Sequence, residues 1–230
     1  MLFLSFLQKQ GFGSRKLCAV AIRSGRVEVN GCVLADPNQD IDPSAVRSVL
    51  FCGQEIPLVP LPFFYLLLNK PAGFETSRHP QHYPSVFSLL PSNIQNLAPQ
   101  AVGRLDADTT GVLLITNDGQ YNHCLTSPKK HVSKIYEVTL KHPAQHAIVE
   151  QLTQGVILKD SPKPCKVVSA VLISPYLLRM EIQEGKYHQV KRMIAAAGNR
   201  VVSLHRISFG PYLLDGLPEM AWRLVEKYEI

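Results

Sequence analysis

A polar turn that leads directly into a continuous apolar run most constrains the fold of this chain. The turn is Gly103-Arg104-Leu105-Asp106, and the apolar run is Val112-Leu113-Leu114-Ile115. An apolar run of this length, bounded by turn residues, is typical of a buried strand, and Asn117-Asp118-Gly119 supplies the turn that ends it. The sequence therefore predicts a polar loop that carries an arginine and an aspartate and leads into the core. Taken alone, such a loop indicates a structural Asp–Arg pair.

The composition is that of a folded and mildly basic protein. Apolar residues make up 46% of the 230 residues, which favours a packed core over disorder. There are 24 Lys and Arg residues against 18 Asp and Glu residues, a formal charge of +6. Such an excess indicates a polyanionic partner such as nucleic acid, although many enzymes are equally basic.

The cysteine and histidine patterns give no sign of a metal site. The five cysteines are scattered and form no CxxC pair, which predicts reduced thiols in a cytoplasmic protein. His79 and His82 have the spacing of half a metal site, but no third ligand follows in a recognisable spacing, so surface histidines are expected. The apolar start, residues 1–7, is too short to span a membrane and is predicted to begin a core-facing helix.

Residues 1–59 are predicted to form a small basic α/β module. Ser14 is a helix N-cap, and the helix it starts ends at Gly25, with Leu17, Val20 and Ala21 on one predicted apolar face. Asn30-Gly31 between apolar residues predicts a hairpin. The helix and the residue after the glycine present four cations that suit RNA phosphates or, equally on pattern alone, form an ordinary solvated face: Arg15, Lys16, Arg23 and Arg26.

The prolines at 60 and 62 disfavour both helix and central strand, so a linker is predicted at residues 59–62 and a second domain at residues 62–230. The expected strands of this domain cover residues 63–68, 112–115, 134–140, 167–173, 176–182 and 201–207. The expected helices cover residues 120–126, 143–154 and a segment starting at residue 184. The alternation of strands and helices favours an α/β fold.

Two side chains of this domain stand out by their position in these elements. Tyr136 lies on the apolar face of its strand with Val138 and Leu140, where a core tyrosine needs a partner for its hydroxyl. Lys191 lies at the edge of a predicted apolar helix face that includes Tyr187 and Val190, and a lysine there is half-buried, either beside a site or covering the core with its stem.

Five motifs in order along nearly the whole chain resemble the pseudouridine synthases of the RsuA type, which isomerise uridine in small-subunit ribosomal RNA. They are SRKLCAVAIRSGRVEVNG, NKPAG, GRLDADTTGVLLITNDG, KIYEV and EGKYHQVKRM. The first resembles an S4 RNA-binding module, although the helix before it is apolar where that module usually begins with basic residues. The resemblance implies a mixed, largely antiparallel sheet flanked by helices.

The resemblance also implies roles for individual residues. Asp106 is expected to be the catalytic carboxylate, Tyr136 to stack on the target base, and Lys191 to keep the carboxylate ionised in a largely dry pocket. Leu204 is expected to pack near the base. From its position beside Asp106, Arg104 is expected to fill or brace the stack that the flipped base leaves, or to pair with Asp106 or Asp108 as a structural ion pair.

The reaction needs no redox cofactor or nucleotide, and the chain contains no GxGxxG, GxxxxGK[ST] or HExxH motif. We therefore expect a monomeric enzyme without a cofactor or metal that modifies small-subunit rRNA, free or within assembly intermediates. Three alternatives remain open: a related synthase for large-subunit rRNA or tRNA, a non-catalytic RNA-binding assembly factor, and a small-molecule acid–base enzyme.

Overall fold

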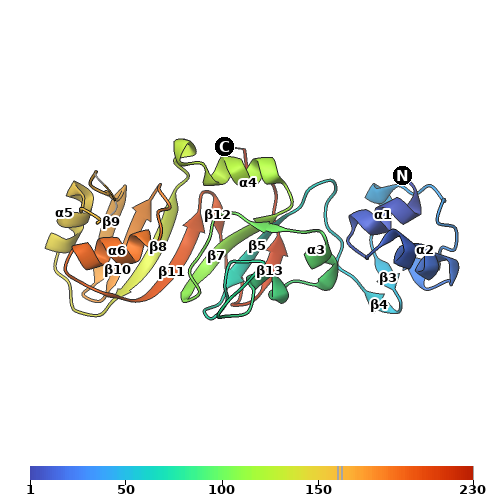
Figure 1. Ribbon diagram of the computed structural model, residues 1–230, viewed down its shortest axis with the longest axis horizontal. Helices are drawn as coiled ribbons and strands as arrows, with labels where there is room; N and C mark the ends of the chain where they lie inside the picture. Colours follow the sequence, from blue (N-terminus) through green and yellow to red (C-terminus); the bar gives the residue numbers. More distant parts are fainter. Residues whose placement is uncertain (160, 162, 230) are drawn as a thin grey trace. The chain divides into compact units, whose positions relative to one another are not determined.

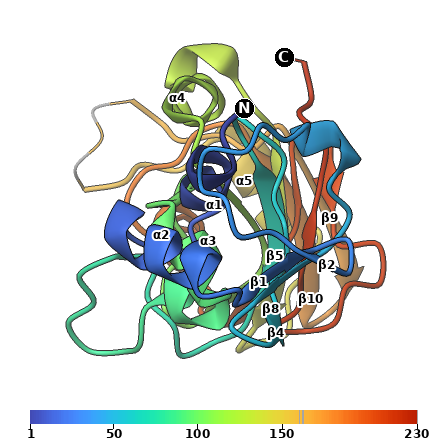
Figure 2. The same cartoon turned by 90° about the vertical axis from the view of Figure 1, so that its right-hand side faces the viewer.

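The computed structural model describes residues 1–159, 161 and 163–229. The chain forms two compact units. The first comprises Met1–Phe64, Phe87–Gln100 and Thr116–Asp118, and the second comprises the rest. Figures 1 and 2 show the helices and strands of each unit.

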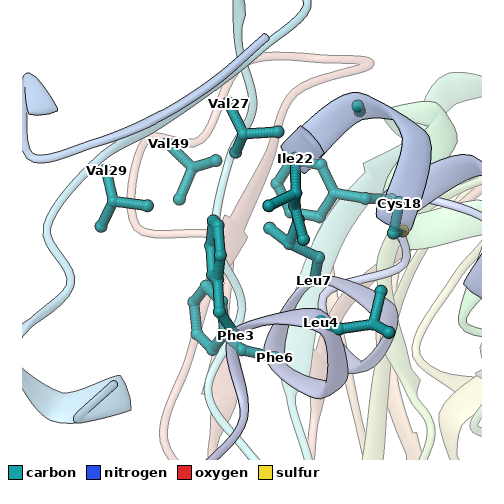
Figure 3. Close-up of a cluster of buried hydrophobic side chains, with 11 residues drawn as sticks. Phe3, Leu4, Phe6, Leu7, Cys18, Ile22, Val27, Val29 and Val49 are labelled. Carbon is teal, nitrogen blue, oxygen red and sulfur yellow. The ribbon is translucent and has the colours of Figure 1, made fainter. Parts of the chain in front are cut away.

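The first unit contains a small antiparallel sheet, in the order β2-β1-β3-β4, together with short helices. Its elements are α1 (Phe3–Lys9), α2 (Arg15–Arg23), β1 (Val27–Val29), β2 (Cys32–Val33), η1 (Pro43–Ala45), β3 (Val49–Phe51), β4 (Gln54–Glu55), η2 (Val86–Leu89, mostly in this unit) and α3 (Ser92–Asn96). Figure 3 shows its core, in which side chains of α1 and α2 meet those of β1 and β3.

The apolar start of the chain forms a core-facing helix, as predicted, because Phe3, Leu4, Phe6 and Leu7 of α1 are all buried. The Ser14 side chain caps α2 by accepting a hydrogen bond from the Leu17 backbone N–H, which confirms the predicted N-cap. The Asn30-Gly31 hairpin is also present, with both residues at positive φ, as a tight two-residue turn requires.

The predicted apolar face of α2 is wrong by part of a turn. Cys18, Ala21 and Ile22 are its buried residues, whereas Leu17 and Val20 are 49% and 59% exposed. The cause is tertiary: α1 and the sheet cover the side of α2 that carries Cys18 and Ile22.

The second unit is built on a nine-stranded sheet in the order β13-β5-β7-β11-β8-β10-β9, with β12 paired to β11 and β6 to β7. The strands are β5 (Tyr65–Lys70), β6 (Gln100–Ala101), β7 (Thr109–Thr116), β8 (Lys134–Leu140), β9 (Ser169–Ser174), β10 (Leu177–Ile182), β11 (Val201–Phe209), β12 (Tyr212–Leu213) and β13 (Trp222–Leu224). β7 and β11 run parallel, whereas β8, β10, β9 and β13 pair antiparallel to their neighbours. The fold is therefore α/β with a mixed, largely antiparallel sheet, as expected.

The described residues of this unit also form the helices α4 (Gly119–Thr126), α5 (Ala147–Gln154) and α6 (Gln189–Ala196) and the 3-10 turn η3 (Pro128–Lys130). α5 contacts β9 and α6 contacts β11 (Figure 1). Val190, Met193 and Ile194 are the buried apolar residues of α6, so the helix turns one side to the core and leaves Lys191 at the border of that side.

Several predicted boundaries differ from the structure, among them the following three. β5 begins at Tyr65 and extends through Asn69 and Lys70, two residues beyond the predicted end of the strand. α5 begins at Ala147 instead of Pro143. Tyr187 precedes α6 and is 69% exposed, so it does not share the apolar face of that helix. The reason is that His188 adopts a left-handed conformation and α6 starts only after it.

Among the described residues, no helix combines the length and the apolar character needed to cross a membrane.

Candidate active site around Asp106

The loop between β6 and β7 presents Asp106, and the segment after β5 fixes this loop. The Gly73 N–H donates to the Ala107 carbonyl at 2.8 Å. The Thr76 hydroxyl donates to the Leu105 carbonyl at 2.8 Å and lies 3.3 Å from the Leu105 N–H. These bonds hold the backbone on both sides of Asp106, so the direction of its carboxylate is set by contacts far apart in sequence.

Lys70 also fixes this loop from the end of β5. Its side chain is fully buried, and its ammonium donates to the carbonyls of Pro71 at 2.9 Å, Ala107 at 3.2 Å and Thr109 at 2.8 Å. Burial lowers the pKa of Lys70 to about 8, although the nearby carboxylates of Asp108 and Asp106 act in the opposite direction. This role was not predicted, since nothing near Lys70 in sequence indicates that it reaches residues 107 and 109.

Lys191 lies between two carboxylates. Its ammonium is 2.9 Å from Asp106 Oδ2 and 2.6 Å from Asp108 Oδ1. Asp106 and Lys191 are 30% and 25% exposed at the side chain, whereas Asp108 is 72% exposed. The structure thus brings Asp106 and Lys191 together. The Asp106 carboxylate retains contact with solvent, so these residues alone do not form the expected dry pocket.

The pKa values of Lys191 and its more exposed partner, Asp108, move in opposite directions. For Asp108, partial burial acts to raise the pKa, but the hydrogen bond and the charge of Lys191 outweigh it and the pKa is lowered. For Lys191, partial burial acts to lower the pKa, but its bonds to Asp108 and Asp106 outweigh it and the pKa is raised. Both shifts favour the charged forms.

His188 is a second partner of Asp106, and it was not predicted. Its Nε2 atom lies 3.3 Å from Asp106 Oδ1, so each oxygen of the carboxylate has one nitrogen partner. His188 directly precedes α6 and has a left-handed backbone, with φ of 47°. Its ring points toward the loop that carries Asp106. The available signal was proximity in sequence, since His188 lies three residues before Lys191.

Tyr136 and Leu204 are buried neighbours on adjacent strands, with 7% and 6% exposure. In the register of β8 and β11, Tyr136 is opposite Arg206 and Val138 is opposite Leu204. Residues directly opposite each other project from the same face, as do residues two apart on one strand. Tyr136 and Leu204 therefore share one face of the sheet. Within the described part of the chain, no hydrogen bond joins the Tyr136 hydroxyl to Asp106.

Arg206 is a buried cation on that face and was not predicted either. It is 2% exposed, its Nε donates to the Val112 carbonyl at 2.8 Å, and its guanidinium carbon lies 5.0 Å from the centre of the Phe209 ring. Its Nη2 atom is buried without a hydrogen-bond partner among the described residues. Next to it, burial lowers the pKa of Lys134 to about 8, and the charge of Arg206 adds to this effect.

The predicted RNA-binding residues Arg104, Arg15, Lys16, Arg23 and Arg26 are exposed. Arg104 is accessible and forms an ion pair with neither Asp106 nor Asp108, since Lys191 and His188 occupy them. In the first unit the four predicted cations are also accessible. Lys16 and Arg26 line a pocket of about 460 Å³ together with Leu17, Val20 and Phe51.

His79 and His82 are exposed, as expected of surface histidines. Within the part of the chain that the structure describes, no three His, Cys, Asp or Glu side chains gather as a metal site would require.

The chain is similar to known proteins over almost its whole length. A family model described as RNA pseudouridylate synthase matches residues 64–196. The ribosomal small subunit pseudouridine synthase A of Yersinia pestis is 40% identical over 210 residues, which cover 91% of this chain and 88% of the relative. A protein of Bacillus subtilis described as an uncharacterized RNA pseudouridine synthase is 38% identical over 212 residues, which cover 91% of this chain and 87% of the relative.

A solved crystal structure of a pseudouridylate synthase matches the three-dimensional fold. It superposes with a TM-score of 0.67 at 32% sequence identity, and the match covers 98% of this chain and 96% of the solved one.

Proposed function

The chain belongs to the RsuA type of the RNA pseudouridylate synthase family, and we propose that it isomerises one uridine of small-subunit rRNA with Asp106 as the catalytic carboxylate. The observation that carries the proposal is the pair of nitrogen contacts on that carboxylate: Lys191 at 2.9 Å on one oxygen and His188 at 3.3 Å on the other. The small-subunit substrate is supported by the names of relatives such as the Yersinia pestis enzyme.

The reaction breaks the C–N bond between uracil and ribose, turns the base and forms a C–C bond, with no net redox change. An ionised carboxylate can serve it either by attacking the sugar carbon or by removing a sugar proton. In both cases the charged form is needed, and a neighbouring ammonium favours that form. Lys191 supplies the ammonium. Asp106 is 30% exposed to solvent. RNA bound over the site then excludes water from this carboxylate.

Tyr136 and Leu204 are proposed to contact the target base, since they share a buried face of the sheet. Base–aromatic stacking contributes about 1–3 kcal/mol. Extruding the base from its helix costs a few kcal/mol, and Arg104, exposed and without a carboxylate partner among the described residues, is proposed to brace the vacated stack. We further propose that residues 1–59 form an S4-like RNA-binding domain and residues 62–230 the catalytic domain.

The experiment that tests the role of Asp106 compares it with its neighbouring carboxylate. We expect Asp106→Asn to abolish tritium release from small-subunit rRNA that contains 5-tritiated uridine, while RNA binding persists. Asp108→Asn is the matched control, because Asp108 contacts the same lysine but is 72% exposed, and it should retain most of the activity. Turnover by Asp106→Asn at the wild-type rate would remove Asp106 from the mechanism.

The substrate is tested by mapping pseudouridine in rRNA from cells that lack the protein. Loss of one pseudouridine in small-subunit rRNA is expected. Loss of a pseudouridine in large-subunit rRNA or tRNA would support the proposed reaction but show that the substrate is not small-subunit rRNA. No lost site, together with purified protein that converts no uridine in naked or partly assembled rRNA, would instead favour a non-catalytic assembly factor.

A further inference from the structure

Tyr187 and His188 form a stacked pair of rings at the start of α6. The ring centroids are 3.8 Å apart and the planes are inclined by only 18°. Tyr187 is 69% exposed, so its ring presents surface to solvent beyond the part that His188 covers. Single exposed aromatic rings are common on protein surfaces, so the weight of this one comes from the ring it stacks on and from the place of that ring.

The pair lies beside the proposed catalytic carboxylate. His188, the inner ring, contacts Asp106 Oδ1 through Nε2 at 3.3 Å. Tyr187, the outer ring, thus stacks directly on the residue that contacts Asp106. Its backbone is fixed as well, because the Arg192 guanidinium donates to the Tyr187 carbonyl at 3.0 Å.

Cations lie close to the stacked pair in sequence. The segment from Lys186 to Arg192 contains three cations and no carboxylate. Lys186 is bound to Glu184 at 3.1 Å, and Lys191 to the two aspartates. The Arg192 guanidinium is bonded to the Tyr187 carbonyl. Rings on which bases stack, combined with neighbouring cations that meet phosphates, are the usual means by which proteins hold unpaired nucleotides.

We propose that the exposed face of Tyr187 is a stacking site for an unpaired nucleobase of the substrate RNA, close to the uridine that enters the Asp106 site. This inference rests on the proposed function. Extrusion of the uridine leaves neighbouring bases without a stacking partner, and the Tyr187 ring replaces that partner for one of them. A base fits this site better than a protein side chain does, because the ring lies one residue from His188, which contacts the carboxylate proposed to act on a uridine of the same RNA.

The test combines a protein variant with a change in the RNA. The substrate is a small-subunit rRNA fragment that contains the modified uridine, and in a series of fragments each neighbouring nucleotide is made abasic in turn. Tyr187→Ala is compared with Tyr187→Phe, which keeps the ring. The control is Tyr176→Ala, which removes a similarly exposed tyrosine, 51% accessible, at the turn between β9 and β10.

We expect Tyr187→Ala to raise KM roughly 5- to 150-fold, the range that corresponds to the loss of one base–aromatic stack, with kcat changed only a few-fold. Tyr187→Phe and Tyr176→Ala should behave like the wild type. One abasic position should raise the KM of the wild type by the same factor, and on that fragment Tyr187→Ala should cause no further loss.

Three results would overturn the inference: an unchanged KM for Tyr187→Ala, an equal penalty on every abasic fragment, or a loss confined to kcat. The last would show that the ring acts only by holding His188. The wild-type series on abasic fragments tests the same stack even where the alanine variant folds poorly. Wild-type protein that converts no uridine at all would instead refute the proposed function, on which the stacking site depends.

Discussion

At the scale of single residues, one ammonium serves two carboxylates. Lys191 contacts Asp106 and Asp108 at 2.9 and 2.6 Å, yet the two aspartates differ sharply in exposure. Ion pairs at exposed groups contribute about 0–1 kcal/mol, because water screens them. The contact with Asp108 therefore adds little. The contact with Asp106 is the one that we expect the reaction to depend on.

The contact between Lys191 and Asp106 predicts a loss of turnover when the ammonium is removed. Lys191→Met removes the cation from Asp106 without much loss of apolar stem, and we expect kcat to fall on the order of 100-fold, as when a fixed electrostatic partner is removed from an active site. Lys191→Arg keeps the charge and should recover part of the loss. Single-turnover rates on a saturating RNA fragment measure this step. Equal turnover by Lys191→Met and the wild type would show that the ammonium does not assist the carboxylate.

Lys70 predicts a pH dependence of stability. Its pKa is about 8 in the folded protein against an ordinary value of 10.5, so the unfolded chain binds more protons between these two values. The free energy of unfolding should therefore rise with pH across this window, and the cost of burying the charge is fully present below pH 8.

The measurement compares urea unfolding of the wild type and Lys70→Met from pH 7 to 10.5, so that other titrating groups cancel. The stability of the wild type relative to the variant should increase by at most about 3 kcal/mol over the window. A constant difference would mean that Lys70 does not titrate there.

At the scale of elements, the parallel pairing of β7 and β11 depends on Gly111. A Cβ atom at this position would lie 2.2 Å from the Arg206 carbonyl oxygen, and the backbone has φ of +103°. Both features exclude an ordinary side chain. Because β7 follows the Asp106 loop and β11 carries Leu204 and Arg206, the close approach also sets the spacing of the site.

We expect Gly111→Ala to lower the free energy of unfolding by at least about 2 kcal/mol, from overpacking and backbone strain together. Gly119→Ala is the control, since Gly119 has open space around its Cβ position and begins α4. Denaturant midpoints of the two variants provide the comparison. Similar midpoints for both variants would show that the sheet can shift to accommodate a side chain at position 111.

Periodicity along the chain identified most elements of the sheet, because a strand such as β8 shows its two faces within seven residues. It failed where a neighbour decides the outcome. The buried side of α2 follows from where α1 packs, and the start of α6 follows from the left-handed turn at His188. The motif run led to Asp106 and Lys191. It did not lead to Lys70 or Arg206, because their partners lie 37 and 94 residues away at Ala107 and Val112.

At the scale of the whole molecule, the chain carries an excess of six positive charges. The cations near Asp106 and those of the first unit differ in whether other groups of the protein bind them. Cations near Asp106 are engaged by carboxylates or carbonyls, as Lys191 and Lys70 are. Those of the first unit, on and after α2, are exposed and have no carboxylate partner among the described residues. Exposed cations of this kind bind phosphates by releasing counterions, and this contribution weakens as salt increases. The first unit should therefore contribute affinity, and the second unit chemistry.

This division predicts a separation of binding from turnover. Replacing Arg15, Lys16, Arg23 and Arg26 together with glutamine should raise KM strongly and leave kcat on saturating rRNA within a few-fold of the wild type. The slope of log Kobs against log salt concentration should shrink by about 0.7–0.9 for each phosphate that is no longer neutralised, so by roughly 3 if all four cations bind RNA. The control replaces Lys141 and Arg200, which are exposed where β8 and β11 end and start, and should leave the slope unchanged. An unaltered slope in the fourfold variant would show that the RNA does not contact α2, and its affinity would then have to come from the cations around the Asp106 loop and α6.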